Sequence, residues 1–305
     1  MKIIQQPDDI AAGARPVCLA IGVFDGVHLG HQEIVRHTLA DARRNDGISL
    51  VVTFDRHPST VVAPDRVPPL IYSPAQKFAA LESLGVHAAL VLEFDLSFSR
   101  QSGEAFIRRL AASAGRIRSI SVGADFTFGH KRSGNVPLLH RLGAELGFDV
   151  HASDPVMFEG QPISSTRIRQ AIRSGHLDLA SRMLGRPYSL AGTVAGGDGL
   201  GRTLGFPTAN LAVDDQALPP AGVYAATARF DGRSQPAVVN IGTRPTLNQP
   251  HPTIRVEAHL IGWSGNLYGV ELELVFGEKL REEKRFASLD ELKSQIARDI
   301  ERARS

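Results

Sequence analysis

Short apolar runs and amphipathic stretches alternate along the first part of the chain. The apolar runs, which we expect to be strands, span residues 17–23, 48–54, 88–94, 117–122 and 148–152. The stretches with helical periodicity between them span residues 32–44, 74–84, 103–112 and 136–146. Such alternation is typical of βαβ units, so the pattern predicts a Rossmann-like α/β domain with a parallel sheet and helices on both faces.

A different pattern follows. Within residues 163–173, Ser and Thr precede a helical pattern and favour a helix N-terminus, and residues 177–184 form a second short helical pattern. After Tyr188, glycines separate β-rich runs at 223–230, 235–241, 253–261 and 271–276, and an amphipathic helix is expected over 289–303. We therefore predict two domains, 1–185 and 186–305, the second being an antiparallel β-barrel with a terminal helix.

The composition is that of an ordinary globular chain, with 43% hydrophobic and 22% charged residues and a net charge of +2. This near balance argues against nucleic-acid binding. No apolar run approaches the roughly 20 residues that cross a bilayer, and the first residues do not resemble a signal peptide. The single cysteine, Cys18, is expected to be a buried thiol. We expect a cytoplasmic protein, a monomer or weak homo-oligomer, that binds small molecules but neither nucleic acid nor membrane.

The sequence GVFDGVHLGH, from Gly22 to His31, lies where the first strand would give way to a helix. There, free N–H groups and the positive end of the helix dipole favour a phosphate. His28 and His31, spaced around Gly30, can donate hydrogen bonds to it. We predict a phosphate site rather than core histidines or a zinc site, for which no third ligand follows at a familiar spacing. Asp25 either caps the turn or contacts the ligand.

Two further segments of the first domain carry candidate chemistry. In ISSTRIR, residues 163–169, hydroxyls on the first turn of a helix precede two arginines. This is either an anion site or a capped surface helix with solvated arginines. In GADFTFG, residues 123–129, Phe126 and Phe128 either pack in the core or line a pocket for a flat ring.

In the second domain, the glycine-rich residues 196–202 could wrap phosphates, but the signal is weak because the chain contains no Walker A sequence. In GFPTAN, Thr208 and Asn210 share one face and offer hard oxygen ligands for Mg²⁺, unless they are simply polar residues of a turn. Glu257 shares the polar face of its strand with His259. It could accept a hydroxyl proton, although the strand pattern alone favours a solvated residue.

Two sets of motifs, in order along the chain, resemble the bifunctional prokaryotic riboflavin kinase/FMN adenylyltransferases, also called FAD synthetases. GxFDGxHxGH, GxDFxFG and ISSTRIR resemble the adenylyltransferase part, and GRTLGFPTAN, GVYA, NIGTRPT and VEAHL resemble the kinase part. The resemblance covers nearly the whole chain. It implies an enzyme that phosphorylates riboflavin to FMN and adenylylates FMN to FAD with release of pyrophosphate. It also implies Mg²⁺ as the metal and ATP, riboflavin and FMN as substrates.

The resemblance implies a role for each matching residue. His28 and His31 would stabilise the leaving pyrophosphate, and Glu257 would activate the ribityl hydroxyl of riboflavin. The other residues expected at ATP in the adenylyltransferase domain are Gly22, Phe24, Asp25, Gly30, Ser164, Ser165, Thr166 and Arg169. Residues expected beside the flavin are Asp125, Phe126, Phe128 and Arg281. In the kinase domain, Thr208 and Asn210 would hold Mg²⁺. The residues expected at the kinase ATP are Gly197, Gly201, Arg202 and Pro207.

One departure is visible: the segment FDRHP carries Arg56 where relatives carry proline, which changes the restraint on that loop. Three alternatives remain. A nucleotidyltransferase with another phosphate acceptor would be shorter and lack the PTAN barrel. An aminoacyl-tRNA synthetase would show a KMSKS-like loop and a basic surface. A flavin-binding regulator with one inactive domain is disfavoured by intact polar residues at both sites.

Overall fold

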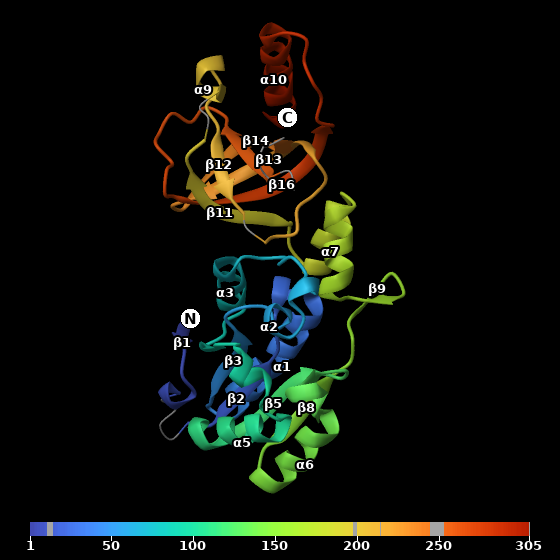
Figure 1. The fold of residues 1–305 in the computed structure, drawn as a ribbon. Coiled ribbons are helices and arrows are strands. Elements are labelled where there is room, and N and C mark those ends of the chain that lie inside the picture. Colours follow the sequence, from blue (N-terminus) through green and yellow to red (C-terminus); the bar gives the residue numbers. More distant parts are fainter. Residues whose placement is uncertain (11–14, 198–199, 214, 245–252, 305) are drawn as a thin grey trace. The chain divides into compact units, whose positions relative to one another are not determined.

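The computed structural model of the chain describes residues 1–10, 15–197, 200–213, 215–244 and 253–304. Contacts within the chain divide it into two units, which we describe separately (Figure 1). The first unit comprises Met1–Leu70 and Pro74–Ser165, and the second comprises Ile71–Ser73 and Thr166–Ser305. We call the second the barrel unit.

The first unit is built on a six-stranded parallel sheet in the order β1-β4-β3-β2-β5-β8. Its strands are β1 (Lys2–Ile4), β2 (Val17–Ile21), β3 (Ile48–Phe54), β4 (Ala88–Leu92), β5 (Ile117–Gly123) and β8 (Asp149–Ser153). After the short β1, the chain starts in the middle at β2 and builds outward, first through β3 to β4 and then through β5 to β8. The switch between these two directions lies between β2 and β5, and it is where such sheets bind ligands.

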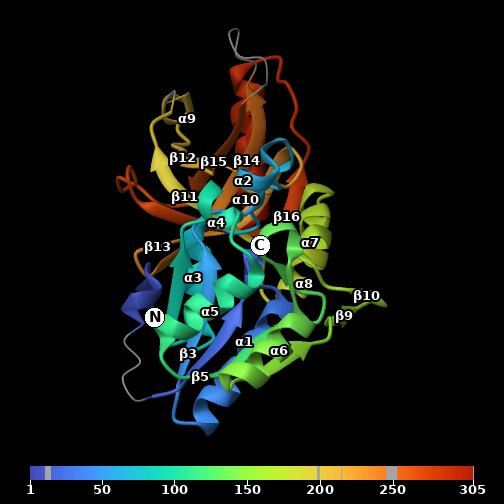
Figure 2. The same cartoon turned by 60° about the horizontal axis from the view of Figure 1, so that its bottom comes forward.

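Helices cover both faces of this sheet, and α5 and α6 lie side by side over one of them (Figure 2). The helices are α1 (Leu29–Arg44), α2 (Ser59–Val62), α3 (Pro74–Ser83), α4 (Leu96–Ser99), α5 (Gly103–Ala114) and α6 (Val136–Leu146). Successive side chains of β2 point to opposite faces of the sheet, which explains why helices pack on both faces. Leu19 lies in the core cluster that includes residues of α5 and α6, whereas Ala20 lies in the cluster with Val35 of α1. The predicted parallel sheet with helices on both faces is confirmed.

Short elements connect these helices and strands. The single-turn helices are η1 (Pro7–Asp9), η2 (Asp25–Val27), η3 (Pro64–Arg66) and η4 (His130–Arg132). Two small antiparallel pairs join β6 (Thr127–Phe128) to β7 (Gly134–Asn135) and β9 (Met157–Phe158) to β10 (Gln161–Pro162). Cys18 is fully buried in β2, as predicted.

The barrel unit contains most of α7 (Ser165–Arg173) and all of α8 (Leu177–Leu184), followed by a closed antiparallel barrel in the order β11-β12-β15-β14-β13-β16. The remaining elements are β11 (Ser189–Ala195), α9 (Leu200–Leu204), β12 (Ala209–Ala212), β13 (Gly222–Phe230), β14 (Arg233–Arg244), β15 (Thr253–Leu260), β16 (Glu271–Arg281) and α10 (Leu289–Arg304). The predicted barrel and terminal helix are confirmed. β11 and α9 were not predicted as regular elements, because they lie in or beside the glycine-rich segment, whereas β12 covers part of the short extended segment expected around Thr208 and Asn210.

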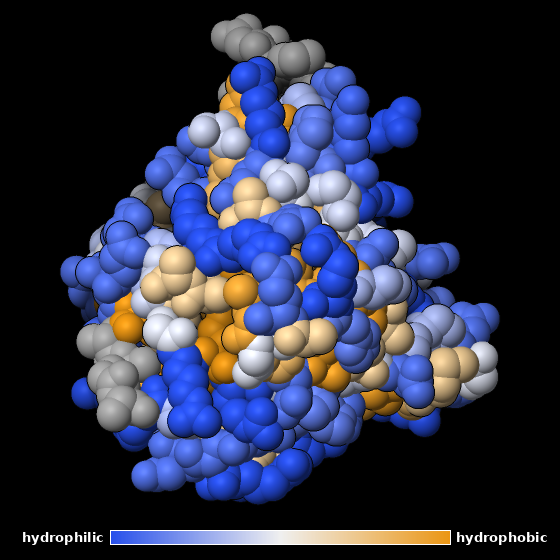
Figure 3. Space-filling view, turned by 90° about the horizontal axis from the view of Figure 1, so that it is seen from below, coloured by the Kyte–Doolittle hydropathy of each residue, from blue (hydrophilic) through white to orange (hydrophobic). Residues whose placement is uncertain are grey.

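The face of the molecule seen from below is mostly polar (Figure 3). In the view of Figure 3, hydrophilic residues surround a smaller area of hydrophobic ones. Large exposed apolar side chains, such as Val62, Leu96 and Met157, lie on separate elements. Among the described residues, none of the helices combines the length and the apolar character needed to cross a membrane.

Helix α10 is fastened to the barrel by apolar and ionic contacts. Its Ile300 packs against a cluster that includes Val238. Asp299 is 2% exposed and accepts hydrogen bonds from Nε of Arg281 on β16 and from Nε2 of Gln295, each at 2.8 Å. Two donors therefore compensate the burial of this carboxylate.

We expect Asp299→Ala to destabilise the barrel unit by about 2–4 kcal/mol, because it leaves the mostly buried Arg281 guanidinium without its carboxylate partner. The fluorescence of Trp263, the single tryptophan, during denaturant unfolding measures this loss. Glu278→Ala is the matched control, because its partner Arg302 is exposed and such pairs contribute about 0–1 kcal/mol. Equal losses in the two variants would contradict the argument.

Candidate functional site

The turn between β2 and α1 lies at the switch point of the first unit's sheet. Phe24, Gly26 and Val27 have φ angles of 55°, 77° and 39°, so the chain reverses sharply through η2. Left-handed backbone is uncommon for phenylalanine and costly for a β-branched valine. The turn ends at His28, which is the N-cap of α1. It therefore places the start of α1 at the carboxyl end of the central strand.

The two histidines lie at this helix start with their rings stacked, the centroids 3.6 Å apart and the planes at 17°. The backbone N–H of His31 donates to Nδ1 of His28 at 3.3 Å. Because Nδ1 accepts, the neutral His28 ring carries its proton on Nε2. A Cβ on Gly30 would lie 3.2 Å from Cε1 of His28, so only glycine leaves this ring undisturbed. Helix α1 begins before the predicted residue 32 because an imidazole, rather than a usual capping residue, caps it.

Two of the predicted ATP contacts are buried beneath the histidines. Phe24 is fully buried and its ring meets that of His31 edge-on, with the centroids 5.2 Å apart. Its side chain therefore supports His31. A Cβ on Gly22 would lie 3.2 Å from the Phe24 ring. Asp25 is 4% exposed, and its carbonyl oxygen accepts a hydrogen bond from Oγ of Ser165 at 3.1 Å. The contacts of these residues with ATP remain predictions.

A cation that the sequence analysis missed lies beside the turn. Nζ of Lys77 on α3 donates to Oγ1 of Thr53 at 3.3 Å and to the carbonyl oxygen of Phe54 at 3.1 Å. Burial lowers the pKa of Lys77 to about 8, against the opposing effect of the Asp25 and Asp55 carboxylates. Perturbed groups of this kind gather at functional sites. Within a helical pattern a lysine is expected to be solvated, so neither spacing nor composition marks this one as a site residue.

The FDRHP segment follows β3. Nε and Nη2 of Arg56 lie 2.9 and 2.8 Å from Oδ2 of Asp55, and the N–H of Phe94 donates to Oδ1 at 2.9 Å. Burial alone would raise the pKa of Asp55, but the hydrogen bonds from Arg56 and Phe94 lower it overall. An ion pair thus restrains the segment at the position where the resemblance expects proline.

The predicted flavin residues of the first unit lie at the end of β5, the strand next to β2. A Cβ on Gly123 would lie 3.3 Å from Oδ1 of Asp125, so the carboxylate folds back over the strand end. Phe126 and Phe128 are half-buried, pack against the core and stack with centroids 5.2 Å apart. The structure brings these three residues to the end of β5. This end lies beside that of β2, where the turn from Gly22 to Val27 leads to His28 and His31; we call it the histidine turn.

The ISSTRIR segment is divided between the units. Ser164 and Ser165 belong to the first unit, where Ser165 reaches the histidine turn through Asp25. The exposed Thr166 and the buried Arg169 belong to the barrel unit. Their place at the ATP phosphates therefore remains a prediction.

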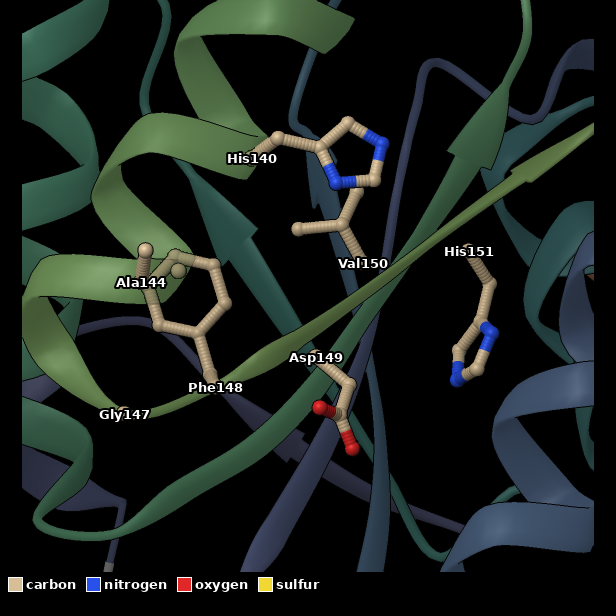
Figure 4. Close-up of a pocket in the computed structure, with 8 residues that line it drawn as sticks. His140, Ala144, Gly147, Phe148, Asp149, Val150 and His151 are labelled. Atoms are coloured by element: carbon tan, nitrogen blue, oxygen red, sulfur yellow. The ribbon is translucent and has the colours of Figure 1, made fainter.

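A shallow cavity of about 670 Å³ lies at the edge strand β8, lined by the end of α6 and the beginning of β8. Figure 4 shows His140 beside Val150, with Asp149 and His151 on the same strand. Nε2 of His151 lies 2.7 Å from Oδ2 of Asp41 on α1. Because the cavity borders the amino end of β8, it lies at the edge of the sheet opposite the histidine turn and is not part of the candidate site.

In the barrel unit, Glu257 lies in a row of polar residues. Asn210 on β12 and Asn240 on β14 both pair with Glu257 on β15, and residues directly opposite each other project to the same side. Val256 and Ala258 are buried on the other side, while the Glu257 side chain is 31% exposed. The result is a half-buried carboxylate between two amides, with Nη1 of Arg255 at 3.9 Å from Oε1 of Glu257. Asn240 belongs to the NIGTRPT motif, but only the strand register reveals its place beside Glu257.

The main chain at two glycines of the glycine-rich segment lies against the side chains of the predicted metal ligands, Thr208 and Asn210. A Cβ on Gly197 would lie 2.1 Å from Nδ2 of Asn210, and one on Gly201 would lie 3.1 Å from Oγ1 of Thr208. The structure thus brings the glycine-rich segment and the PTAN segment together, as a phosphate-wrapping loop requires. Residues 198–199 of this segment lie outside the described residues.

The neighbouring residues support this arrangement. Nδ1 of His259 lies 2.8 Å from the carbonyl oxygen of Pro207, and its ring meets Phe206 edge-on. His259 thereby fastens the PTAN segment to β15. Arg202 is exposed on α9. Within the described part of the chain, no cluster of three or more His, Cys, Asp or Glu residues could hold a metal.

Arg281 is the predicted flavin residue of the barrel unit, and its guanidinium donates hydrogen bonds within the protein. Besides its bond to Asp299, Nη1 donates to the carbonyl oxygen of Glu282 at 3.1 Å, and the group lies 5.5 Å from the centroid of Phe286. Contact with the flavin remains a prediction.

Comparison with known proteins covers both units. A family model described as FAD synthetase matches residues 11–167, and one described as riboflavin kinase matches residues 184–305. Three curated relatives are named bifunctional riboflavin kinase/FMN adenylyltransferase. The one from Escherichia coli strain K12 is 39% identical, covering 98% of this chain and 96% of the relative. Those from Haemophilus influenzae (38%, covering 94% and 93%) and Pseudomonas fluorescens (37%, covering 100% and 97%) are similar.

A solved structure from Streptococcus pneumoniae, described as a macrolide-efflux protein, matches 99% of this chain and 98% of its own with a TM-score of 0.85 and 30% identity. That description applies to the pneumococcal protein. The curated relatives match both units at higher identity and agree on two activities. The chain therefore belongs to the bifunctional riboflavin kinase/FMN adenylyltransferase family and is an enzyme that makes FMN from riboflavin and FAD from FMN.

Proposed function

We propose that FMN adenylyltransfer takes place at the turn between β2 and α1, and that riboflavin phosphorylation takes place beside Glu257 on the barrel. The observation that carries this proposal is the stacked pair of His28 and His31 at a helix start on the switch point of the sheet. The order of the two matching family models supports the same division. We take 1–185 and 186–305 as the two functional domains.

In the adenylyltransfer step, a phosphate oxygen of FMN bonds to the α-phosphorus of ATP while the bond to the β-phosphate oxygen breaks. The nucleophile is already ionised at neutral pH, so this step requires no general base. It requires stabilisation of the leaving pyrophosphate, which donors fixed in advance supply best. We assign this role to His28, His31 and the N–H groups at the start of α1, completed by Ser164, Ser165, Thr166 and Arg169.

In the kinase step, the 5′ hydroxyl of riboflavin bonds to the γ-phosphorus of ATP, and ADP leaves. Here the nucleophile carries a proton, which we assign to Glu257. Asn210 and Asn240 flank this carboxylate and fix its surroundings. Most of the remaining catalysis is positioning, because phosphoryl transfer leaves little covalent chemistry to the protein.

Mg²⁺ fits the donors at the kinase site. Thr208 offers a hydroxyl and Asn210 an amide oxygen, both hard ligands, and the close approach of Gly197 and Gly201 places main chain beside them. When bound, the ion would neutralise negative charge on the ATP phosphates. We propose that Arg202, Pro207 and the two glycines contact this ATP.

The flavin contacts are proposals of the same kind. Asp125, Phe126 and Phe128 lie at the β5 end, where they can flank FMN, and we assign Arg281 to riboflavin on the barrel. We further propose a cytoplasmic protein that binds no nucleic acid and acts as a monomer or weak homo-oligomer, because both substrates are small and the chain carries little net charge.

One assay tests the pair of activities. The purified protein is incubated with riboflavin, ATP and Mg²⁺, and the flavins are separated by chromatography over time. FMN is expected first and FAD afterwards, and FAD alone is expected when FMN replaces riboflavin. Absence of both products would overturn the proposal.

We expect His28→Ala and His31→Ala each to lower FAD formation from FMN by about 10²–10³-fold, because each removes a donor to the leaving group. FMN formation from riboflavin should be unchanged. His28→Ser is the matched variant, since serine keeps the helix cap but lacks the imidazole. If His28→Ser restored FAD formation, the role of His28 would be capping alone.

Glu257→Gln should lower FMN formation by about 10²–10⁴-fold, because glutamine has the same shape but accepts no proton. FAD formation from supplied FMN should remain. Glu271→Gln, on another strand of the same barrel, is the control and should retain both activities. A wild-type kinase rate for Glu257→Gln would remove this residue from the role of base.

Thr208→Val should raise the Mg²⁺ concentration that gives half-maximal kinase activity by about tenfold, because it removes one hard oxygen ligand at nearly constant volume. The measurement is a Mg²⁺ titration of FMN formation at fixed ATP. The same titration of FAD formation should be unaffected. An unchanged kinase titration would argue that Thr208 does not hold the ion.

A further inference from the structure

Helix α3 directs one ammonium group at the carboxyl end of β3. Lys77 is half-buried, and its Nζ donates to the side chain of Thr53 and to the carbonyl oxygen of Phe54. Neither the motifs of the chain nor the proposed reaction assigns this lysine a role. Partial burial of an ammonium costs free energy, which here the two hydrogen bonds and the nearby carboxylates of Asp25 and Asp55 offset in part.

The ammonium is connected to the histidine turn through one hydroxyl group. Thr53 is fully buried, and its Oγ1 donates to the carbonyl oxygen of Val23 at 3.0 Å. A hydroxyl has a single proton, so Thr53 donates to Val23 and accepts from Lys77. Val23 directly precedes the left-handed part of the turn at Phe24. The hydrogen bonds therefore run from α3 through β3 to the turn.

The turn depends on such external support. Positive φ angles at Phe24 and Val27 are unfavourable and persist only where the surroundings hold them. Ser165 holds the turn at the carbonyl oxygen of Asp25, and Gln32 holds it at that of Val27, 2.9 Å from Nε2. Thr53 holds the turn at the carbonyl oxygen of Val23, and its hydroxyl accepts in turn from the charged side chain of Lys77.

We propose that Lys77 is a positioning residue for FMN adenylyltransfer: through Thr53, its ammonium braces the Gly22–Val27 turn that presents His28 and His31. The inference rests on the proposed role of these two histidines. Lys77 acts through Thr53 and the backbone, and it need not touch the substrate.

Deprotonation of Lys77 weakens this brace in a defined way. A neutral amine is a poorer donor and can itself accept the Thr53 proton, which competes with the bond to Val23. The carboxylates that face Lys77 are Asp25 in the turn and Asp55 after β3, and both favour the charged amine, but burial outweighs them and lowers the pKa to about 8. FAD formation should therefore fall as the pH rises through about 8, while FMN formation should not.

The experiment measures FAD formation from FMN, and FMN formation from riboflavin, in the same preparations between about pH 6.5 and pH 9.5. Lys77→Arg keeps its charge throughout this range, so the alkaline fall in FAD formation should disappear. Lys77→Met should form FAD at least about tenfold more slowly at neutral pH and show no fall near pH 8. Kinase activity should be unchanged in both variants.

Thr53 offers a matched pair that leaves the charge in place. Thr53→Val removes the hydroxyl at nearly constant volume and should lower FAD formation as Lys77→Met does. Thr53→Ser retains the hydroxyl and should preserve both the rate and the alkaline fall. Circular dichroism confirms that each variant is folded before its rates are compared.

A wild-type pH profile in Lys77→Arg, or full FAD formation by Lys77→Met, would overturn the inference about Lys77. Full FAD formation by the alanine variants of His28 and His31 would instead overturn the proposed role of the histidines. The two failures are thus distinguished by different variants in the same assay.

Discussion

The first unit depends on a short left-handed turn that the chain makes on leaving its central strand. With positive φ at Phe24, Gly26 and Val27, η2 redirects the backbone so that α1 starts directly over the switch point. Nothing in the intrinsic preference of phenylalanine or valine favours this conformation. It persists because Phe24 is fully buried and because side chains from β3, α7 and α1 hold the carbonyl groups of Val23, Asp25 and Val27. Packing and hydrogen bonding elsewhere thereby offset local strain at the site.

The carboxylates at the two proposed sites have different surroundings. Near the histidines, Asp25 is buried and Asp55 is paired with Arg56, which helps to lower the pKa of Asp55 and makes it a poor base. On the barrel, Glu257 is partly exposed and lies opposite two amides, and Nη1 of Arg255 is 3.9 Å from its Oε1, beyond hydrogen-bond distance. Arg56, by contrast, bonds Asp55 directly. In the proposed reactions a hydroxyl nucleophile requires a proton acceptor, whereas a phosphate nucleophile does not, and the looser contact of Glu257 with its arginine suits that role.

The sequence predicts those elements and site residues that a local hydrophobic pattern or a short motif encodes. Apolar runs predicted the sheet and most of the barrel, but the three-residue β1 and β11, which Gly192 interrupts, carry too little pattern to be recognised. The site residues that were missed depend on long-range geometry. Asn240 becomes relevant only through its register opposite Glu257, and Lys77 only because α3 packs its side chain against the end of β3. Neither spacing nor composition contains that information.

Arg56 illustrates how a motif can change while its structural role is kept. Proline restrains a loop covalently, in the unfolded chain as well as the folded one, and so lowers the entropy lost on folding. The pair of Arg56 with Asp55 forms only in the folded protein and is largely exposed. It holds the loop without reducing the freedom of the unfolded chain, so it contributes less to stability. The loop nevertheless keeps its anchor to Phe94, because that bond uses the other oxygen of Asp55. The conformation after β3 therefore depends on the carboxylate more than on the residue that follows it.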